Sequence, residues 1–288
     1  MRIVILGFLL FILLNENVHA QEQDHIAYAH ITEGYWQIWV MNSDGTGKRQ
    51  VTRSPQDKRE LTWISSEQKI AFSTSNGEIF TVDIGGKNEV QILKQYGVVT
   101  SPAFSSASHK IIFVRFDPTG KDLGDIWESD FNGGNLNRLT TDCRGKFQPS
   151  FSAQGDRIAF IKSDVEKNYH IWIMKADGNN PQPLTGGKAL DIHPHFSPDQ
   201  KYITFSSNRN DNDYEIYNVE VATKKISRLT HSAGLDNQSS YSSDGQKIVF
   251  VSNRSGSQQL WIMDKDGSNP IQLTHDAEES IDPLWIRQ

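Results

Sequence analysis

Most of the chain consists of short apolar clusters separated by polar turns, and four such clusters recur in the same order six times. The first cluster ends in an aromatic residue, and the second is an aliphatic run that also ends in an aromatic. The third is an aliphatic–aromatic pair, and the fourth closes on Val or Leu. Short clusters without helical periodicity are typical of β-strands. The pattern therefore predicts six units of four short strands.

Closing Leu-Thr pairs set the period of this repeat. The pairs that follow one another at intervals of 44 or 45 residues are Leu139-Thr140, Leu184-Thr185, Leu229-Thr230 and Leu273-Thr274. Turn signals such as Asp177-Gly178 follow the third cluster, and Gly there accepts the positive φ that a tight hairpin needs. Four strands in about 45 residues are the pattern of a β-propeller blade.

The two ends of the repeat region complement each other. The first repeat, residues 25–52, lacks its first strand, and residues 281–286 resemble that missing strand. We therefore expect the C-terminal strand to join the N-terminal blade and close the ring, whereas an open solenoid would need capping repeats. The predicted fold is an all-β, six-bladed propeller of four-stranded antiparallel blades in residues 21–288. The expected blades are 25–52 with 281–288, 59–94, 100–140, 147–185, 192–230 and 237–274.

The repeats resemble those of the TolB-type propeller family, also called PD40 or WD40-like repeats. The segments that carry this resemblance are Phe196-Ser197-Pro198-Asp199, Phe205 to Arg209, Tyr241 to Gly245, and Leu260 to Met263. The resemblance implies the fold and a capacity to bind. Members of the family in a periplasmic envelope system dock a peptidoglycan-associated lipoprotein on the propeller. Similar repeats form accessory domains of prolyl oligopeptidase-type and tricorn-type peptidases and occur in oligogalacturonate lyases.

The N-terminus has the pattern of an export signal. Arg2 precedes the apolar run Ile3 to Leu14, and Val18-His19-Ala20 places small residues at the cleavage positions. We expect cleavage after Ala20, because a membrane anchor needs about 20 apolar residues and this run is shorter. The mature chain is then periplasmic or secreted and has no transmembrane segment. The net charge of −6 and the absence of a Lys/Arg run exclude a phosphate-neutralising nucleic-acid interface.

The chain contains no recognisable catalytic set. No Ser lies in a Gly-x-Ser-x-Gly setting, and there is no phosphate-binding or dinucleotide-binding fingerprint. Cys143 is interpreted as an incidental loop thiol, and Asp211-Asn212-Asp213 as a hairpin rather than a calcium loop. We expect Arg209 and Arg254 to bond neighbouring backbone rather than to present donors to an anionic partner. The protein is therefore predicted not to be an enzyme.

Alignment of the repeats identifies one candidate binding site. The residue before the first-strand Pro, or its equivalent, is polar in every blade, and the six are Glu60, Ser101, Gln148, His193, Gln238 and Asp282. Since first strands are innermost in a propeller, these residues are expected to ring one mouth of the central channel. Such a ring would hold a divalent cation, ordered water or a partner's residue, or it would only solvate the channel wall. His193 and His195 are the metal candidates, although two ligands do not complete a site.

The expected function is binding of an envelope or extracellular protein by a monomeric exported module, without catalysis and without a resident cofactor. The alternative is a metal-assisted lyase or hydrolase that acts on a carbohydrate at the channel mouth, with His193, His195, Glu60 and Asp282 as its residues. A third possibility is a structural subunit of a larger complex. Fold alone does not decide among these functions.

Overall fold

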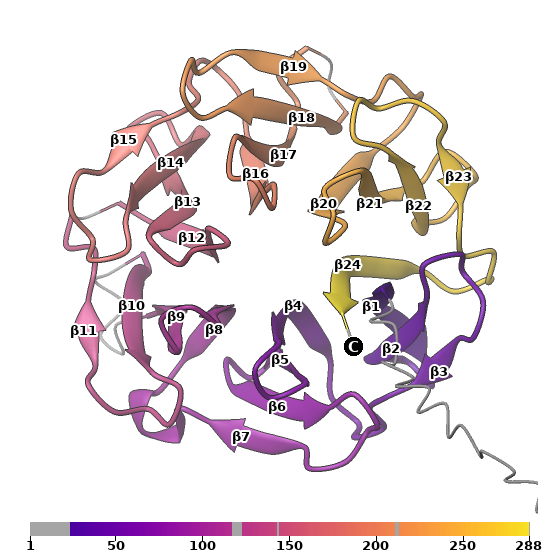
Figure 1. Ribbon diagram of the computed structural model, residues 1–288, viewed down its shortest axis with the longest axis horizontal. Coiled ribbons are helices and arrows are strands. Elements are labelled where there is room, and N and C mark those ends of the chain that lie inside the picture. Colours follow the sequence, from indigo (N-terminus) through magenta and orange to yellow (C-terminus); the bar gives the residue numbers. More distant parts are fainter. Residues whose placement is uncertain (1–23, 117–122, 143, 211–212, 288) are drawn as a thin grey trace, which may run out of the picture.

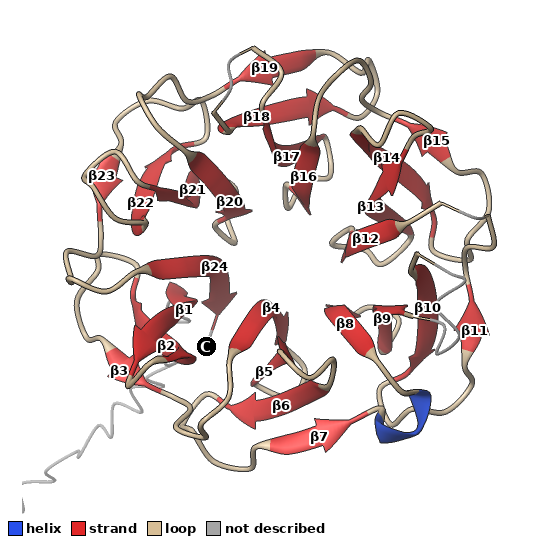
Figure 2. Cartoon of the chain, turned by 180° about the vertical axis from the view of Figure 1, so that it is seen from behind, coloured by secondary structure: helices blue, strands red, loops and turns tan. Residues whose placement is uncertain are grey.

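The computed structural model describes residues 24–116, 123–142, 144–210 and 213–287. Within these ranges the strands β1 to β24 form six four-stranded antiparallel sheets that stand around a common axis (Figures 1 and 2). This confirms the predicted six-bladed propeller. The one helical turn in the described residues, the 3-10 helix Lys94–Tyr96, lies in the second blade, where Lys94 replaces the Thr of the Leu-Thr pair.

Strands are given from the axis outward. The first blade contains β24 (Ser280–Arg287), β1 (Asp24–Thr32), β2 (Tyr35–Asn42) and β3 (Arg49–Gln50). The second contains β4 (Lys58–Ile64), β5 (Lys69–Thr74), β6 (Ile79–Asp83) and β7 (Val90–Ile92). The third contains β8 (Val99–Ser105), β9 (Lys110–Arg115), β10 (Asp125–Asp130) and β11 (Asn137–Arg138).

The remaining three blades follow the same order. The fourth contains β12 (Lys146–Phe151), β13 (Arg157–Ser163), β14 (Tyr169–Lys175) and β15 (Gln182–Pro183). The fifth contains β16 (Asp191–Phe196), β17 (Tyr202–Ser207), β18 (Glu215–Glu220) and β19 (Ile226–Arg228). The sixth contains β20 (Asp236–Tyr241), β21 (Lys247–Ser252), β22 (Gln259–Asp264) and β23 (Ile271–Gln272).

The C-terminal strand closes the ring, as the complementary ends of the repeat region predict. β24 pairs antiparallel with β1, with Ile26 opposite Trp285 and His30 opposite Ser280. It also packs against β20, β21 and β4 of the two neighbouring blades (Figure 1). Closure therefore leaves no first strand exposed at the end of an open array.

The Leu-Thr pairs have a structural role within each blade. In five blades the Thr hydroxyl oxygen accepts the backbone N–H of the first aliphatic residue of the third strand at 2.9 or 3.0 Å. For example, Thr230 accepts from Ile216, and Thr140 accepts from Ile126. These N–H groups are buried and need a partner, so Thr at this position secures the connection from the outer strand to the next blade.

The Gly of the outer hairpin touches the Leu of the preceding blade. Gly178, with φ +83°, lies so close to the Leu139 carbonyl oxygen that an added Cβ would be 2.7 Å from it. Gly45 approaches the Leu273 carbonyl of the sixth blade in the same way, at 3.0 Å from its would-be Cβ. The Asp-Gly and Leu-Thr motifs of successive repeats therefore meet at the blade boundaries, and both the turn and the close approach require Gly.

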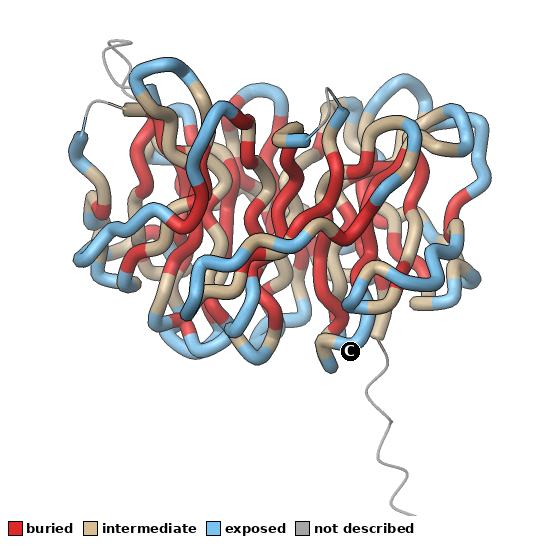
Figure 3. Tube along the Cα trace, turned by 90° about the horizontal axis from the view of Figure 1, so that it is seen from above, coloured by how far each residue is buried: buried red, intermediate tan, exposed pale blue. Residues whose placement is uncertain are grey.

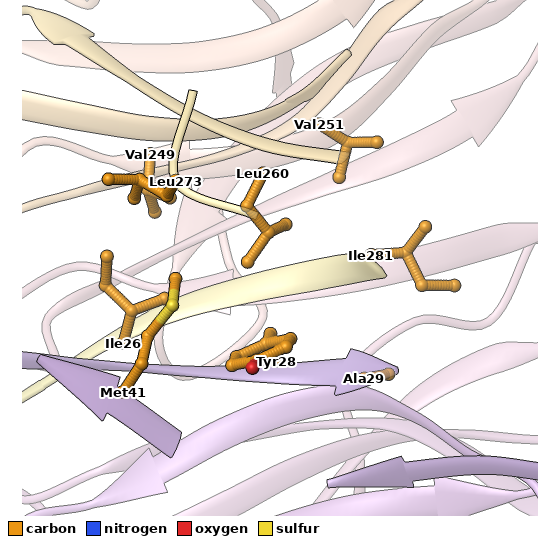
Figure 4. Packing of buried hydrophobic residues seen from close by; sticks show 9 residues of the cluster. All are labelled: Ile26, Tyr28, Ala29, Met41, Val249, Val251, Leu260, Leu273 and Ile281. Carbon is orange, nitrogen blue, oxygen red and sulfur yellow. The ribbon is translucent and has the colours of Figure 1, made fainter. Parts of the chain in front are cut away.

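The hydrophobic core lies between adjacent sheets. At the closing boundary, Ile26, Tyr28 and Ile281 of the first blade pack against Val249 and Val251 of the sixth (Figure 4). Equivalent clusters occur at the other blade boundaries. Buried segments run through the strands, and exposed segments lie in the loops of the two faces (Figure 3). We call the face at which the first strands begin the entry face, and the opposite face the hairpin face.

Candidate functional site

Six aligned polar residues occupy the same position in the six innermost strands. Each is the third residue of its strand, each lies at a β-bulge where the register with the next strand shifts, and each has φ between +48° and +56°. Side-chain-bearing residues rarely adopt positive φ, and Gly is usual at such bulges. The residues are Glu60 in β4, Ser101 in β8, Gln148 in β12, His193 in β16, Gln238 in β20 and Asp282 in β24.

Most of these side chains reach across to the next blade. Gln238 Oε1 accepts the Asp282 amide at 3.0 Å, and Asp282 Oδ2 accepts the Glu60 amide at 3.0 Å. Glu60 Oε2 then accepts the Ser101 amide at 2.7 Å. Further round the ring, Gln148 Oε1 accepts the His193 amide at 2.8 Å. Four of the six ring residues therefore act as side-chain clamps between neighbouring first strands.

Two positions depart from this arrangement. The Ser101 side chain is short and turns back, and its hydroxyl donates to Glu60 Oε1 at 2.8 Å. At the ring position that follows His193, the backbone N–H of Gln238 donates to Ser206 Oγ at 3.1 Å, and not to the His193 imidazole. The ring of side chains is therefore continuous from Gln238 through Asp282 and Glu60 to Ser101, and it is interrupted on both sides of the Gln148–His193 pair.

The two carboxylates of the ring, Asp282 and Glu60, have different partners. Arg59 Nε donates to Asp282 Oδ2 at 2.8 Å, and the Arg59 guanidinium also lies 5.1 Å from the centre of the Trp36 ring. The partners of the Glu60 carboxylate are the amide and hydroxyl of Ser101. Asp282 is therefore neutralised by an arginine, while Glu60 is stabilised by hydrogen bonds.

His193 and His195 both line the channel, His193 within the bulge of β16 and His195 at the first paired position after it. Burial lowers the pKa of His193 to about 4, against the opposing effect of Asp282 and with a further lowering by Arg59. Burial also lowers the pKa of His195. Both imidazoles are neutral at pH 7, and the Nδ1 atom of each is buried without a hydrogen-bond partner among the described residues.

Neutral imidazoles are the metal-binding form, so these two histidines have suitable chemistry for a ligand pair. A protein zinc site needs three or four ligands. Within the described ranges, no group of three or more His, Cys, Asp or Glu side chains is placed to hold a metal ion. The described residues therefore provide two imidazoles in the channel wall and no third protein ligand beside them.

The first strands enclose a cavity of about 390 Å³ along the axis, with the six ring residues in its wall. Its wall changes character along the strands, from the polar ring near the entry face to aromatic side chains nearer the hairpin face. A second cavity of about 290 Å³ opens on the hairpin face and shares part of this wall. The residues that line both cavities are Trp63, Phe151, His195, Tyr241 and Trp285.

Sequence reasoning identified these aromatic positions only as ends of the first strands, and it missed Arg59 altogether. The recurrence of an aromatic three residues after each ring position was the available signal. Alternation alone places that residue on the opposite side of the strand from the ring residue. The bulge at the ring residue shifts this alternation and brings five of these side chains to the channel wall, and they are Trp63, Phe104, Phe151, Tyr241 and Trp285.

Arg209 and Arg254 bind side chains rather than the backbone that we expected. Arg209 Nη2 contacts both carboxylate oxygens of Asp191 at 2.8 Å, and Arg254 Nη2 contacts Asp236 at 2.7 Å. Both carboxylates are fully buried at the start of their first strands. These arginines therefore neutralise buried acids, because an unpaired buried charge is costly, and they are not free donors for an anionic partner.

Three sequence-based interpretations concern residues outside the described ranges. They are the signal segment 1–20, Cys143, and the first two residues of Asp211-Asn212-Asp213. A search of the described residues for a helix long and apolar enough to cross a membrane finds none.

A closed six-bladed propeller with a polar ring in its channel is the class of protein that the fold and site define. The family model for the TolB beta propeller domain, PD40, matches residues 19–191 and 188–288. The chain belongs to the TolB β-propeller family. No curated protein matches the sequence.

Solved structures agree with this fold. TolB from Acinetobacter baumannii superposes with a TM-score of 0.79 at 20% identity, over 91% of this chain and 66% of that chain. The chain thus spans slightly less than two thirds of that TolB. A putative TolB from Agrobacterium tumefaciens gives a TM-score of 0.72 at 20% identity, over 88% and 89% of the two chains. An oligogalacturonate lyase in complex with manganese gives 0.59 at 14% identity, over 86% and 73%. At these identities the likeness concerns the fold alone.

Proposed function

We propose that this protein is an exported binding module, periplasmic or secreted, that engages an envelope or extracellular protein on its entry face without catalysis. The observation that carries the proposal is the distribution of exposed apolar side chains. Seven large apolar residues are exposed in the described part of the chain. Four of them lie on the entry face, Tyr35 at the start of β2 and Val98, Leu123 and Val165 in loops.

These four residues follow the rim of the propeller from the first blade to the fourth. Tyr35 begins β2, directly after the hairpin from β1, and Val98 directly precedes β8. Leu123 lies between β9 and β10, and Val165 lies between β13 and β14. Exposed apolar side chains spaced along the rim of one face, around a concave channel mouth, offer contacts to a protein partner.

The mouth of the channel on this face supplies polar contacts for a partner. Arg59 and Trp36 stack beside the ring, and Arg and Trp are the residue types that contribute most at protein interfaces. The six ring residues lie immediately inside this mouth and make its wall polar. Membership of the TolB propeller family supports an envelope partner.

An affinity-capture experiment tests this proposal. Mature chain carrying Leu123→Asp or Val165→Asp is compared with the unaltered chain in capturing protein from envelope extract. Val90→Asp and Ile271→Asp are the matched controls, because they place the same charge at exposed apolar positions on the outer strands β7 and β23. We expect a specific partner to be lost with the first pair and retained with the second. Capture that is equal for all four variants, or the absence of any captured protein, would refute the proposal.

A metal-assisted lyase or hydrolase is the second candidate, with His193, His195, Glu60 and Asp282 as its residues. All four lie in the channel wall. The carboxylates of Glu60 and Asp282 already accept hydrogen bonds from the backbone of the next blade. Of the four side chains, the two imidazoles are therefore the ones available to bind a metal ion. Metal analysis of the purified chain, with activity assays of Glu60→Ala, distinguishes this candidate from the binding module.

A further inference from the structure

Glu60 carries a charge that its structural role does not require. Its carboxylate holds the neighbouring first strand by accepting the Ser101 amide at 2.7 Å. Gln148 and Gln238 hold neighbouring first strands in the same way in two other blades, through an uncharged side-chain oxygen at 2.8 and 3.0 Å. A glutamine would therefore serve at residue 60 as well, and the inter-blade hydrogen bond does not explain the negative charge there.

This charge is not balanced in the wall of the axial cavity. The side chains that are charged at pH 7 in this wall are Arg59, Glu60 and Asp282. Arg59 pairs with Asp282 at 2.8 Å, whereas the partners of the Glu60 carboxylate are the amide and hydroxyl of Ser101. Burial lowers the pKa of the two channel histidines, which therefore add no positive charge. One guanidinium against two carboxylates gives the wall a net charge of −1.

The Glu60 carboxylate is placed to act on an occupant of the cavity. A carboxylate has about four lone-pair sites, and Ser101 uses one on each oxygen. Glu60 is only partly buried, and it lines a cavity of about 390 Å³, a volume in the range of small-molecule sites. An unbalanced carboxylate beside low-dielectric walls attracts a cation more strongly than it would in open water.

Aromatic side chains form the deeper part of the same wall. Five aromatic residues from five different blades line the cavity, and they are Trp63, Phe104, Phe151, Tyr241 and Trp285. The electron-rich face of an aromatic ring attracts a cation, and aromatic-lined pockets are typical sites for organic ammonium groups. Trp63 follows Glu60 by three residues in β4, so one strand brings both a carboxylate and an indole ring to the cavity.

An organic cation suits this wall better than the other classes of small ligand. A metal ion needs three or four protein ligands, and the described residues offer no group of three His, Cys, Asp or Glu placed to hold one. An organic cation needs the field of a carboxylate and an aromatic surface rather than a set of ligands. An anion would be repelled by the net charge, because the one arginine of the wall is already paired with Asp282. A neutral ligand would gain nothing from the charge of Glu60.

We propose that the axial channel binds an organic cation, an ammonium or guanidinium group, with Glu60 as its counter-charge and the aromatic wall as its packing surface. The group belongs either to a free small molecule or to a Lys or Arg side chain that the partner inserts from the entry face. Both sources use the same chemistry, because the polar ring lies near the entry face and the aromatic side chains lie beyond it. Only the second source rests on the proposed function.

Calorimetric titration of the mature chain, followed also by tryptophan fluorescence, tests the site directly. Choline, butylammonium and methylguanidinium are the cationic probes. The neutral alcohol in which carbon replaces the choline nitrogen is the control, because it has the same shape without the charge. We expect at least one cation to bind, and the neutral alcohol to bind about tenfold more weakly than choline or not at all.

Three substitutions assign the binding to Glu60. Glu60→Gln should weaken cation binding about tenfold, because it removes the counter-charge and keeps the oxygen that accepts the Ser101 amide. Glu278→Gln removes an exposed acid from the loop before β24 and should bind like the unaltered chain. Arg59→Gln should tighten binding about threefold or more, because it leaves Asp282 without its arginine and makes the wall more negative. Opposite shifts from two substitutions in one channel are not explained by a loss of folding.

Capture from envelope extract distinguishes the two sources of the cation. If the partner supplies it, Glu60→Gln should lose a partner that Glu278→Gln retains. If a free molecule supplies it, Glu60→Gln should fail only in the titration. The proposal is overturned if no cation binds the unaltered chain at about 10 mM and Glu60→Gln also captures the partner normally. Where no partner is captured at all, the titration alone decides.

Two further results would overturn the proposal. One is binding of the neutral alcohol as tightly as choline, which would mean that the channel does not recognise charge. The other is equal cation affinity in Glu60→Gln and Glu278→Gln, which would place the binding elsewhere. The entry-face variants Leu123→Asp and Val165→Asp should bind free cations like the unaltered chain, so failure of the proposed partner binding is distinct from failure here.

Discussion

Gln238 and Asp282 bond to each other in both directions. The Gln238 side-chain carbonyl accepts the Asp282 amide at 3.0 Å, and the Gln238 side-chain NH₂ donates to the Asp282 carboxylate. The other Asp282 oxygen accepts from the Glu60 amide at 3.0 Å and from Arg59 at 2.8 Å. A single side chain of the closing strand therefore holds the sixth and second blades to the first.

This relationship predicts that Asp282→Ala destabilises the ring. The substitution removes an ion pair and leaves the Glu60 amide and the Gln238 side-chain NH₂ without acceptors, and hydrogen bonds to charged groups are the stronger ones. We expect the free energy of unfolding to fall by about 2–3 kcal/mol in urea denaturation. Glu278→Ala, an exposed acid in the loop before β24, should change it by less than about 0.5 kcal/mol. Equal stability of the two variants would contradict a closing role for Asp282.

The Leu-Thr motif provides a test with adjacent residues. Thr140 Oγ1 accepts the Ile126 amide at 3.0 Å and donates to Asp125 at 2.7 Å, whereas Thr141 is exposed. Thr140→Val keeps the shape of the side chain but leaves a buried N–H unpaired, so unfolding should become easier by about 1–3 kcal/mol. Thr141→Val, measured in the same urea series, should be close to neutral. If the two substitutions cost the same, the recurring Thr has no special structural role.

Two glycines with the same φ allow the cost of backbone strain to be measured separately from the cost of a steric clash with the neighbouring blade. Gly178 and Gly34 both have φ +83°, but an added Cβ meets the Leu139 carbonyl oxygen at Gly178 and nothing within 4 Å at Gly34. Gly34→Ala should therefore cost only the left-handed conformation, about 1–2 kcal/mol. Gly178→Ala should cost about 1–3 kcal/mol more, because the neighbouring blade must shift. Thermal and urea unfolding of both variants measure the difference, and equal costs would mean that the boundary adapts freely.

The repeat period and the complementary chain ends were sufficient to predict the blades, their number and the closing strand. They suffice because the period of a blade is local, whereas bulges and side-chain hydrogen bonds, within a blade or between blades, depend on geometry that the sequence does not display. The bulge at His193, where φ is +55°, is an example. Regular alternation would have predicted unbroken pairing of β16 with β17 from Asp191 to Phe196, whereas the register shifts between Ile192 and His195. The pairing of Arg209 with Asp191, 18 residues apart in the chain, was missed for the same reason.

His193 makes folding stability depend on pH. Its pKa is lowered from 6.5 to about 4, chiefly by burial, while Asp282 opposes and Arg59 adds to this shift. The unfolded chain therefore binds more protons than the folded chain between these two values, and stability falls as the pH falls from 6.5 towards 4. Below that window both states carry the proton and the loss is complete. A shift of this size corresponds to roughly 3 kcal/mol when the loss is complete, most of which is lost by pH 4.

His193→Gln should abolish this contribution, because glutamine does not titrate and already occupies the equivalent position in two blades, at Gln148 and Gln238, with the same positive φ. Urea unfolding at pH 7 and pH 4 measures the effect as the difference between the unaltered chain and the variant, so that other titrating groups, including His195, cancel. The unaltered chain should lose about 2–3 kcal/mol more than His193→Gln on this change of pH. His109→Gln, at an exposed turn, should follow the unaltered chain. If His193→Gln loses as much stability between pH 7 and pH 4 as the unaltered chain, the pKa of His193 is not lowered in the folded protein. The assignment of a neutral imidazole to the ring would then be wrong.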